Sequence, residues 1–439
     1  MTKIDCDLLI DARWVLPMAP DTGVLEHASV AVSGGRIQAV GDREAIHAAY
    51  QAAGQVNLAE HVLLPGLVNA HGHAAMSLLR GYAEDAPLAE WLHDHIWPLE
   101  ARLVSEAFVR DGVHLAMAEM IRSGTTCFAD MYFFPEITAA AARQAGLRCQ
   151  VAFPIIPFAN AWSADVDDAL HKGMALHDDY RGHGLIRVAF GPHAAYSVSR
   201  GDLERIRTFA DELEAAVHIH LHETAAEVAE ARAAHGQSWI EGLEELGLLG
   251  PRLQAVHVTQ ADDDEIALLA RAQVQVVHCP HSNLKLASGI CPVARLQEAG
   301  ITVALGTDGA ASSNTLDVLG EARLAALLAK FASGDPRSLP EARALEMATL
   351  GGARALGLEA ECGSLEPGKQ ADLTAVNLGA ARFAPVYDPL SALVHTEAGS
   401  AVSHVWVAGR PLLADGELQT LDEAAIMADA GAWRQRVLN

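Results

Sequence analysis

The sequence predicts an α/β protein, a (β/α)8 TIM barrel joined to a small β-sandwich domain that both chain termini build. Two observations support this prediction. Short apolar runs alternate with segments rich in Ala, Leu, Glu and Arg over roughly 300 residues, and such alternation is typical of a parallel sheet. Two similar hairpin patterns also lie at opposite ends of the 439-residue chain, which indicates one domain made from both ends.

Eight apolar runs are spaced through the middle of the chain, and each is expected to form one strand. Helix-like segments, such as those at 106–122 and 224–246, follow most of the runs. Eight such units fit a TIM barrel, which usually takes about 250 residues before insertions. The first run ends in His71-Gly72-His73, and the others are 125–129, 149–153, 186–190, 217–221, 254–258, 274–277 and 302–305.

The two ends of the chain share a strand–turn–strand pattern. Near the start, two apolar segments of 29–40 flank Ser33-Gly34-Gly35, and near the end, two segments of 403–413 flank Ala408-Gly409. Glycine turns between short β-branched runs are typical of hairpins. The predicted division is residues 1–60 and 363–439 for the β-sandwich domain and residues 61–362 for the barrel.

Charge and composition exclude several classes of function. The chain has 31 Lys and Arg against 56 Asp and Glu, a net charge of −25. Nucleic acids and anionic membranes bind clustered Lys and Arg, so neither is an expected partner. No apolar stretch is long enough to span a bilayer, and acids interrupt the first apolar run, which argues against a signal peptide. The six cysteines are scattered, so reduced thiols and a cytoplasmic location are expected.

Polar residues gather where the expected strands end. In a TIM barrel the carboxyl ends of the strands form the active-site face. Side chains that follow successive strands are therefore expected to meet there. They are His71 and His73 after the first run, His193 after the fourth, His220 and Glu223 at the fifth, His257 at the sixth, His278 and His281 after the seventh, and Asp308 after the eighth.

A divalent metal site is the chemistry that these residue types favour. His71 and His73 can face one ion together, because residues i and i+2 of a strand point the same way. Three imidazoles and one carboxylate suit a transition metal, most simply Zn²⁺, which lowers the pKa of bound water from about 15.7 to about 7. His218 and His222 share the strand face of His220 and stay open as alternatives to it. The predicted ligands of one divalent ion per chain are His71, His73, His220 and Asp308.

Glu223 and His257 are candidates for proton transfer and for orienting the water. Glu223 follows His220 by three residues, where the strand gives way to a helix, and a carboxyl group there can act as general acid and base. The alternative for Glu223 is an acid that only favours a helix N-terminus. His257 is expected to steady the water from the next strand, with a buried neutral histidine as its alternative.

Several other catalytic signatures are missing from the sequence. It has no P-loop, no His-Glu-x-x-His and no Gly-x-Ser-x-Gly. The combined His-x-Glu and Pro-Cys-x-x-Cys pattern of cytidine-deaminase-type enzymes is also absent. The fourth run ends in Gly191-Pro192-His193 without a lysine, so a carbamylated lysine that bridges two metal ions is not expected there.

Four motifs together resemble the amidohydrolase superfamily: His71-Gly72-His73, His220-Leu221-His222-Glu223, His257 and Gly306-Thr307-Asp308-Gly309. The resemblance covers essentially the whole chain, including the split β domain. Within the superfamily, residues 91–100, 191–197 and 282–289 are similar to the aminohydrolase branch with one metal, which includes 5′-methylthioadenosine/S-adenosylhomocysteine deaminases. Chlorotriazine and guanine deaminases share much of this pattern.

The resemblance implies further roles. Glu100 would hold the ribose hydroxyls, because a carboxylate can accept two hydrogen bonds from a diol. His193 would contact the purine, and Trp91 and Trp97 would belong to a lid or apolar wall, with core packing as the alternative. Relatives that handle S-adenosylhomocysteine tend to carry arginines after the third strand for the amino-acid carboxylate. Residues 151–162 here contain none.

The resemblance therefore implies hydrolytic deamination of an adenosine-type nucleoside to an inosine analogue and ammonia. 5′-Methylthioadenosine is the expected substrate, with S-adenosylhomocysteine and adenosine as further candidates. Activated water would attack C6 while Glu223 protonates N1 and Asp308 passes the water proton to the departing amine, so both carboxylates contact the substrate. Two alternatives stay open: a hydrolase of another heterocycle (guanine, a triazine or a pterin), and a non-catalytic barrel that only binds or assembles. Homo-oligomerisation is left open as well.

Overall fold

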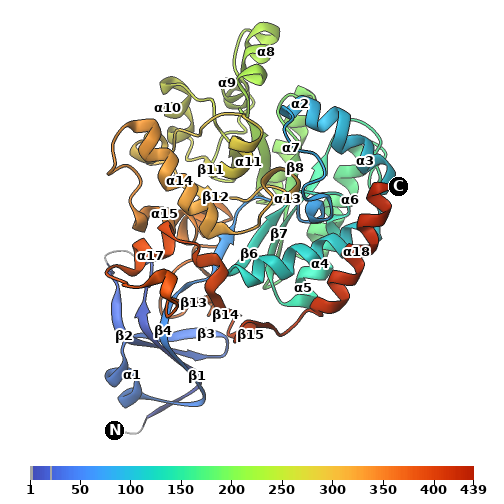
Figure 1. Cartoon of the computed structure of the whole chain (residues 1–439). Helices are drawn as coiled ribbons and strands as arrows, with labels where there is room; N and C mark the ends of the chain where they lie inside the picture. The colour runs from blue at the N-terminus through green and yellow to red at the C-terminus, as the bar shows by residue number, and fades with distance from the viewer. Residues whose placement is uncertain (1–2, 20–21) are drawn as a thin grey trace.

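Two eight-stranded sheets organise the protein (Figure 1). The structure is a computed structural model, and it describes residues 3–19 and 22–439. One sheet is parallel and contains β5 to β12 in sequence order, which is the succession of strands in a barrel. The other sheet is mixed and combines strands from both ends of the chain. The predicted fold class is confirmed.

The barrel strands coincide with the predicted apolar runs to within a few residues. Buried residues fill most of them, as expected for a parallel sheet covered on both faces. Backbone bonds join the last strand to the first: Ala70 N–H donates to the Leu305 carbonyl at 2.8 Å, and Asp308 N–H donates to the His71 carbonyl at 3.1 Å. The strands are β5 (Leu67–Asn69), β6 (Thr125–Asp130), β7 (Arg148–Ile155), β8 (Ile186–Pro192), β9 (Val217–Leu221), β10 (Leu253–His257), β11 (Gln275–His278) and β12 (Val303–Leu305).

Helices follow the barrel strands and surround the sheet. Local sequence sets several of their starts: the Ser105 side chain accepts from Phe108 N–H at the start of α4, and Asp262 with Glu265 forms a capping box at the start of α10. The helices are α4 (Glu106–Arg122), α5 (Pro135–Ala145), α6 (Val166–Asp179), α7 (Arg200–Glu212), α8 (Ala225–His235), α9 (Trp239–Glu245), α10 (Asp263–Arg271), α11 (Pro280–Lys285), α12 (Val293–Glu298), α13 (Ala310–Ser313), α14 (Val318–Ser333), α15 (Glu341–Met347) and α16 (Leu350–Ala355).

An insertion separates β5 from α4. It contains the short helices η1 (Ala74–Leu79), α2 (Leu88–Glu90) and η2 (Trp91–Ile96), and it ends in α3 (Trp97–Leu103). The insertion reaches the end of β6, where Tyr132 contacts α3. This arrangement places residues of the insertion beside the carboxyl ends of the barrel strands.

The mixed sheet joins the two chain ends. β4 pairs in antiparallel fashion with β13, so that Leu373 lies opposite Pro65. A buried ion pair at 2.9 Å connects Arg148 of the barrel to Asp372, directly before β13. The elements are β1 (Ile4–Val15), β2 (Leu25–Ser33), β3 (Arg36–Asp42), α1 (Arg43–Ala49), β4 (Tyr50–Pro65), β13 (Leu373–Asn377), η3 (Ala381–Phe383), α17 (Pro389–His395), η4 (Ala398–Ala401), β14 (Val402–Val407), β15 (Arg410–Ala414) and β16 (Glu417–Leu418).

The C-terminal helix α18 (Glu423–Leu438) lies against the barrel helix α4 (Figure 1). Trp433 donates its indole N–H to Asp111 at 2.8 Å, and its ring meets Phe108 edge to face. The domain boundaries at residues 60 and 362 stay a prediction. Within the described residues, no helix is both long enough and apolar enough to cross a bilayer.

Candidate active site

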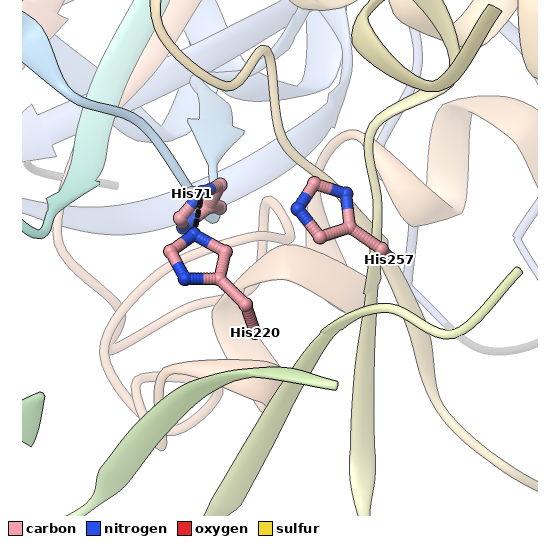
Figure 2. A group of neighbouring side chains, drawn as sticks. All are labelled: His71, His220 and His257. Carbon is pink, nitrogen blue, oxygen red and sulfur yellow. Dashed lines mark hydrogen bonds between the residues drawn. The ribbon is translucent and has the colours of Figure 1, made fainter. Parts of the chain in front are cut away.

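Four histidines and one aspartate converge at the carboxyl ends of the barrel strands. His71 Nε2 lies 3.3 Å from His220 Nε2 and 3.4 Å from Asp308 Oδ1, and His73 Nε2 lies 3.2 Å from the same oxygen. Figure 2 shows the rings of His71, His220 and His257 turned toward one common point. The structure thus brings together the four residues predicted as ligands, with His257 beside them.

The tautomers of two of these histidines are fixed by backbone carbonyls. His73 Nδ1 lies 2.6 Å from the Met131 carbonyl, and His220 Nδ1 lies 2.6 Å from the His193 carbonyl. A carbonyl only accepts, so Nδ1 of each ring is the donor. A neutral imidazole carries one N–H, which leaves the Nε2 lone pair free to bind a metal ion.

The donor atoms fit a divalent ion. Burial lowers the pKa of His71 and of His220 well below the usual value, so both rings are neutral near pH 7. Their Nε2 atoms face each other at 3.3 Å, an arrangement that a cation between them would make favourable. Ligand atoms bound at about 2.0–2.1 Å to a tetrahedral zinc ion stand about 3.3 Å apart. The separations of 3.2–3.4 Å in this cluster match that value.

Asp308 is held in place from two sides. Its Oδ2 accepts from Ser282 Oγ at 2.6 Å, and its Oδ1 accepts from Gly309 N–H at 2.8 Å. The backbone of Asp308 lies in the left-handed region (φ 60°), a conformation that costs free energy and is typical of functional sites. Burial opposes protonation of His73, but its hydrogen bond to Asp308 raises the pKa of His73 to about 9. A bound cation would take the place of that proton.

Glu223 lies just after β9 with its carboxyl group buried beside the cluster. Oε1 accepts from Ser288 Oγ at 3.1 Å, and Oε2 lies 3.6 Å from His257 Nε2. Burial is the largest influence on this carboxyl and raises the pKa of Glu223, which makes its protonated form more accessible. His257 Nδ1 in turn faces the Asn283 side-chain amide at 3.0 Å.

The alternative role considered for Glu223, an acid at a helix start, is filled by another residue. Glu227 accepts from the backbone N–H of His222 at 3.0 Å and of Glu223 at 2.8 Å. These bonds satisfy the backbone amides that precede α8. The Glu223 carboxylate is therefore free to face the barrel mouth.

The residues predicted to bind the substrate occupy different environments. Glu100, on α3, accepts from the Tyr132 hydroxyl at 2.6 Å, and burial raises the pKa of Glu100 to about 7. His193 follows β8, with its ring centroid 5.0 Å from that of His220. Trp91 packs in the core with 5% of its surface exposed. Contact of Trp91 with a substrate stays a prediction.

Most apolar residues of 151–158 are buried, so this stretch exposes little apolar surface. Val151 and Phe153 lie on β7 inside the core, where Phe153 packs against Phe190 with ring centroids 4.9 Å apart. Ile156 is buried as well. Within the fully described stretch 151–162, only Phe158, which is 57% exposed, presents a large apolar side chain to solvent.

Comparison with known families decides the class of the protein. Residues 62–412 match the amidohydrolase family, a range that runs from β4 through the whole barrel to β15. The chain belongs to the amidohydrolase family. A curated relative from Teredinibacter turnerae, named 5-methylthioadenosine/S-adenosylhomocysteine deaminase, is 49% identical over 98% of each chain. A relative of the same name from Saccharophagus degradans is 48% identical over 99% of this chain and 98% of its own.

Solved structures resemble this amidohydrolase over nearly its full length. An adenosine deaminase from Xanthomonas campestris with bound zinc has a TM-score of 0.98 at 47% identity and 99% coverage of both chains. An atrazine chlorohydrolase from Arthrobacter aurescens complexed with zinc has a TM-score of 0.90 at 26% identity, covering 97% of this chain and 99% of its own. Together with the histidine and aspartate cluster, these neighbours show that the amidohydrolase uses a metal cofactor.

The structure resolves two alternatives for the ligand on β9. The His222 backbone turns into the left-handed region (φ 52°), and its ring bonds the Gln260 carbonyl at 2.7 Å, away from the cluster. His218 contacts His71 Nδ1, on the side of the ring that faces away from the cluster. His220 is therefore the β9 histidine placed to bind the ion.

Four side chains that hold the site were not predicted from the sequence. Ser282, Asn283 and Ser288 bond Asp308, His257 and Glu223 respectively. All three lie in the stretch 282–289 that carries the family resemblance, so a signal for them existed. Tyr132, which bonds Glu100, had no such signal.

Proposed function

We propose that this amidohydrolase is a metal-dependent deaminase of adenosine-type nucleosides that yields the inosine analogue and ammonia. 5′-Methylthioadenosine is its best substrate, and S-adenosylhomocysteine and adenosine are further candidates. The names of the curated relatives support this substrate class. The observation that supports the proposal most strongly is the convergence of the His71, His220 and Asp308 donor atoms beside the buried carboxyl group of Glu223.

The metal site is proposed to hold one Zn²⁺ per chain through His71, His73, His220 and Asp308. When bound, this ion would lower the pKa of a water molecule to about 7. His257 would orient that water, because its Nε2 faces the cluster from the neighbouring strand. Asn283 steadies the other edge of the His257 ring.

Two carboxyl groups are proposed to move protons. Glu223 holds a proton for N1 of the purine, and its hydrogen bond from Ser288 fixes the direction in which it is presented. The Asp308 carboxylate takes the proton of the attacking water and delivers it to the departing amine. Ser282 fixes the orientation of this carboxylate by donating to Oδ2, which keeps Oδ1 beside the Nε2 atoms of His71 and His73. Such transfers contribute roughly 10²–10⁴-fold to the rate.

The substrate is proposed to lie between the insertion after β5 and the strand ends. Glu100 accepts from the ribose hydroxyls, with Tyr132 holding one of its oxygens. His193 contacts the purine ring, and Trp91 supports the apolar wall. Phe158, which is exposed just after β7, is proposed to cover the 5′ substituent.

A substrate panel tests this proposal. Purified metal-loaded protein is incubated with 5′-methylthioadenosine, S-adenosylhomocysteine, adenosine, guanine, a chlorotriazine and a pterin, and ammonia release is measured. Turnover restricted to the adenosine-type compounds is the expected result. A preference for guanine or a triazine would show that the substrate is another heterocycle. Absence of turnover with every compound would favour a non-catalytic binding protein. The Glu223→Gln variant is the matched control.

The binding partners and the cellular compartment of the enzyme are also proposed. A net charge of −25 supports a small-molecule substrate without a nucleic-acid or membrane partner. Six free, buried cysteines support a reducing compartment, the cytoplasm. Whether a homo-oligomer forms can be measured by sedimentation of the metal-loaded protein.

A further inference from the structure

A chain of hydrogen bonds runs from His71 through the interior of the barrel to the backbone of α16. His71 Nδ1 lies 2.7 Å from His218 Nε2, and His218 Nδ1 lies 2.7 Å from Gln254 Oε1. Gln254 Nε2 donates to the Ala355 carbonyl at 2.9 Å. His71, His218 and Gln254 are each no more than 1% exposed, so water does not compete for these bonds.

The Ala355 carbonyl, at the end of this series of hydrogen bonds, determines which group donates and which accepts in every one of them. The Ala355 carbonyl can only accept, so the amide nitrogen of Gln254 must face it and the amide oxygen must face His218. That oxygen requires the N–H of His218 on Nδ1, which leaves a lone pair on Nε2. This lone pair requires the N–H of His71 on Nδ1. The Nε2 lone pair of His71 is thereby directed into the metal cluster.

A second glutamine supports the same orientation. Gln150 on β7 donates to Gln254 Oε1 at 2.7 Å, and Gln254 Nε2 lies 3.2 Å from Gln150 Oε1. The two amides form a reciprocal pair across the barrel interior. Gln150 therefore reinforces the orientation of Gln254, while the Ala355 carbonyl determines it.

We propose that Gln254 is a positioning residue that acts through His218 to hold His71 in the tautomer that binds metal. The proposal rests on the proposed function only in taking His71 as a ligand. A backbone carbonyl fixes the tautomer of His73 and of His220 directly. The tautomer of His71 is instead fixed through two intervening side chains, those of His218 and Gln254. Groups of this kind behind a metal ligand typically change metal affinity or activity by about 10–100-fold.

Two substitutions at Gln254 separate tautomer control from packing. The methionine side chain in Gln254→Met is similar in length to glutamine, but it has no oxygen to accept the hydrogen bond from His218 Nδ1. Gln254→Glu, buried and therefore protonated, presents an O–H to the Ala355 carbonyl and an oxygen to His218, the same pattern as the glutamine. Gln150→Met is the matched control, because it removes an amide from the same interior space and leaves the Gln254–Ala355 bond intact.

Zn²⁺ affinity, measured by competition with a chromophoric chelator, is the primary readout and needs no substrate. We expect Gln254→Met to bind Zn²⁺ about 10–100-fold more weakly than wild type, and Gln254→Glu and Gln150→Met to stay within about threefold. Wild-type affinity in Gln254→Met, or equal losses in Gln254→Met and Gln254→Glu, would overturn the proposal. Because metal binding is measured apart from turnover, failure of the deaminase proposal would give a different result from failure of this one.

Neutron diffraction from crystals of the zinc-loaded wild-type protein tests the proposal without any variant, in case Gln254→Met does not fold. Deuterium is expected on Nδ1 of His218 and on Nδ1 of His71, with both Nε2 atoms bare of deuterium. Deuterium on Nε2 of His218 would overturn the proposed direction of the chain.

Discussion

His220 Nε2 lies 3.3 Å from His71 Nε2, and each ring uses its other nitrogen in a hydrogen bond behind the cluster. Two lone pairs at this distance repel each other unless a cation lies between them. The surrounding barrel holds both rings in place, because His71 is fully buried and His220 is 8% exposed. The barrel thus holds both rings in the positions that an ion between them requires.

Removal of the metal is expected to lower both activity and stability. A ligand that binds only the folded state stabilises it, by about 2.7 kcal/mol at a concentration one hundred times its Kd. Chelated protein should therefore lose turnover and melt at a lower temperature, and re-addition of Zn²⁺ should restore both. Elemental analysis of the fully active protein should give about one ion per chain. A requirement for two tightly held ions would contradict the proposed ligand set.

Glu223→Gln is expected to reduce kcat by roughly 10²–10⁴-fold, because the amide cannot give a proton to the purine. Zn²⁺ content and melting temperature should stay close to wild type, since Glu223 is not a proposed ligand. Ser288→Ala is a milder comparison that removes one hydrogen bond to the Glu223 carboxylate and keeps its proton. Near-normal turnover in Glu223→Gln would place the proton donor elsewhere.

Substrate binding is expected to weaken in acid because of Glu100. Burial raises the pKa of Glu100 to about 7, and its ionised form is the stronger acceptor for the two hydroxyls of the ribose diol. The carboxylate forms as pH rises through the pKa, so KM should be roughly tenfold higher at pH 6 than at pH 8. Glu100→Gln should remove this pH dependence.

Tyr132→Phe provides the companion measurement for Glu100. The Tyr132 hydroxyl donates to Glu100 Oε1 and lowers its pKa, in opposition to burial. Without that bond, the pH at which KM changes should move upward. An unchanged profile in both variants would show that the pH dependence of KM, if present, comes from another group.

5′-Methylthioadenosine is expected to have a higher kcat/KM than S-adenosylhomocysteine. Burying a methyl group against an apolar side chain such as Phe158 is favourable by about 0.8 kcal/mol. A buried carboxylate on the longer substrate would cost several kcal/mol without a charged partner, and residues 151–162 supply no arginine. Phe158→Ala should reduce the preference. Equal values for the two substrates in wild type would reveal an anchor for the amino-acid tail outside this stretch.

The convergence of the four proposed ligands can be predicted from the sequence because local rules determine it. Strand ends share one face of a barrel, so the sequence alone predicts that His220 and Asp308 lie together. His71 and His73 lie after β5 rather than within it, yet their ring centroids are 4.8 Å apart. Tyr132 could not be predicted, because its contact with Glu100 depends on how the insertion folds back over β6.

Contacts inside the barrel also depend on tertiary structure and could not be predicted from the sequence. The sequence indicates His218 as a possible ligand, because it shares the strand face of His220. Its partner Gln254 lies on the neighbouring strand, and the register of β9 against β10 decides that they meet. The burial of Val151 and Phe153 in the core likewise follows from how β7 packs in the barrel.

Product analysis with 5′-methylthioadenosine tests whether the protein is a metal-dependent deaminase. Metal-loaded wild type, chelated wild type and Glu223→Gln are incubated with this nucleoside, and the inosine analogue and ammonia are quantified together. Equal molar amounts of both products are expected from the metal-loaded wild type, and at least 10²-fold slower formation is expected in the other two samples. Ammonia release that survives both metal removal and Glu223→Gln, or no deamination by the metal-loaded wild type, would contradict this function.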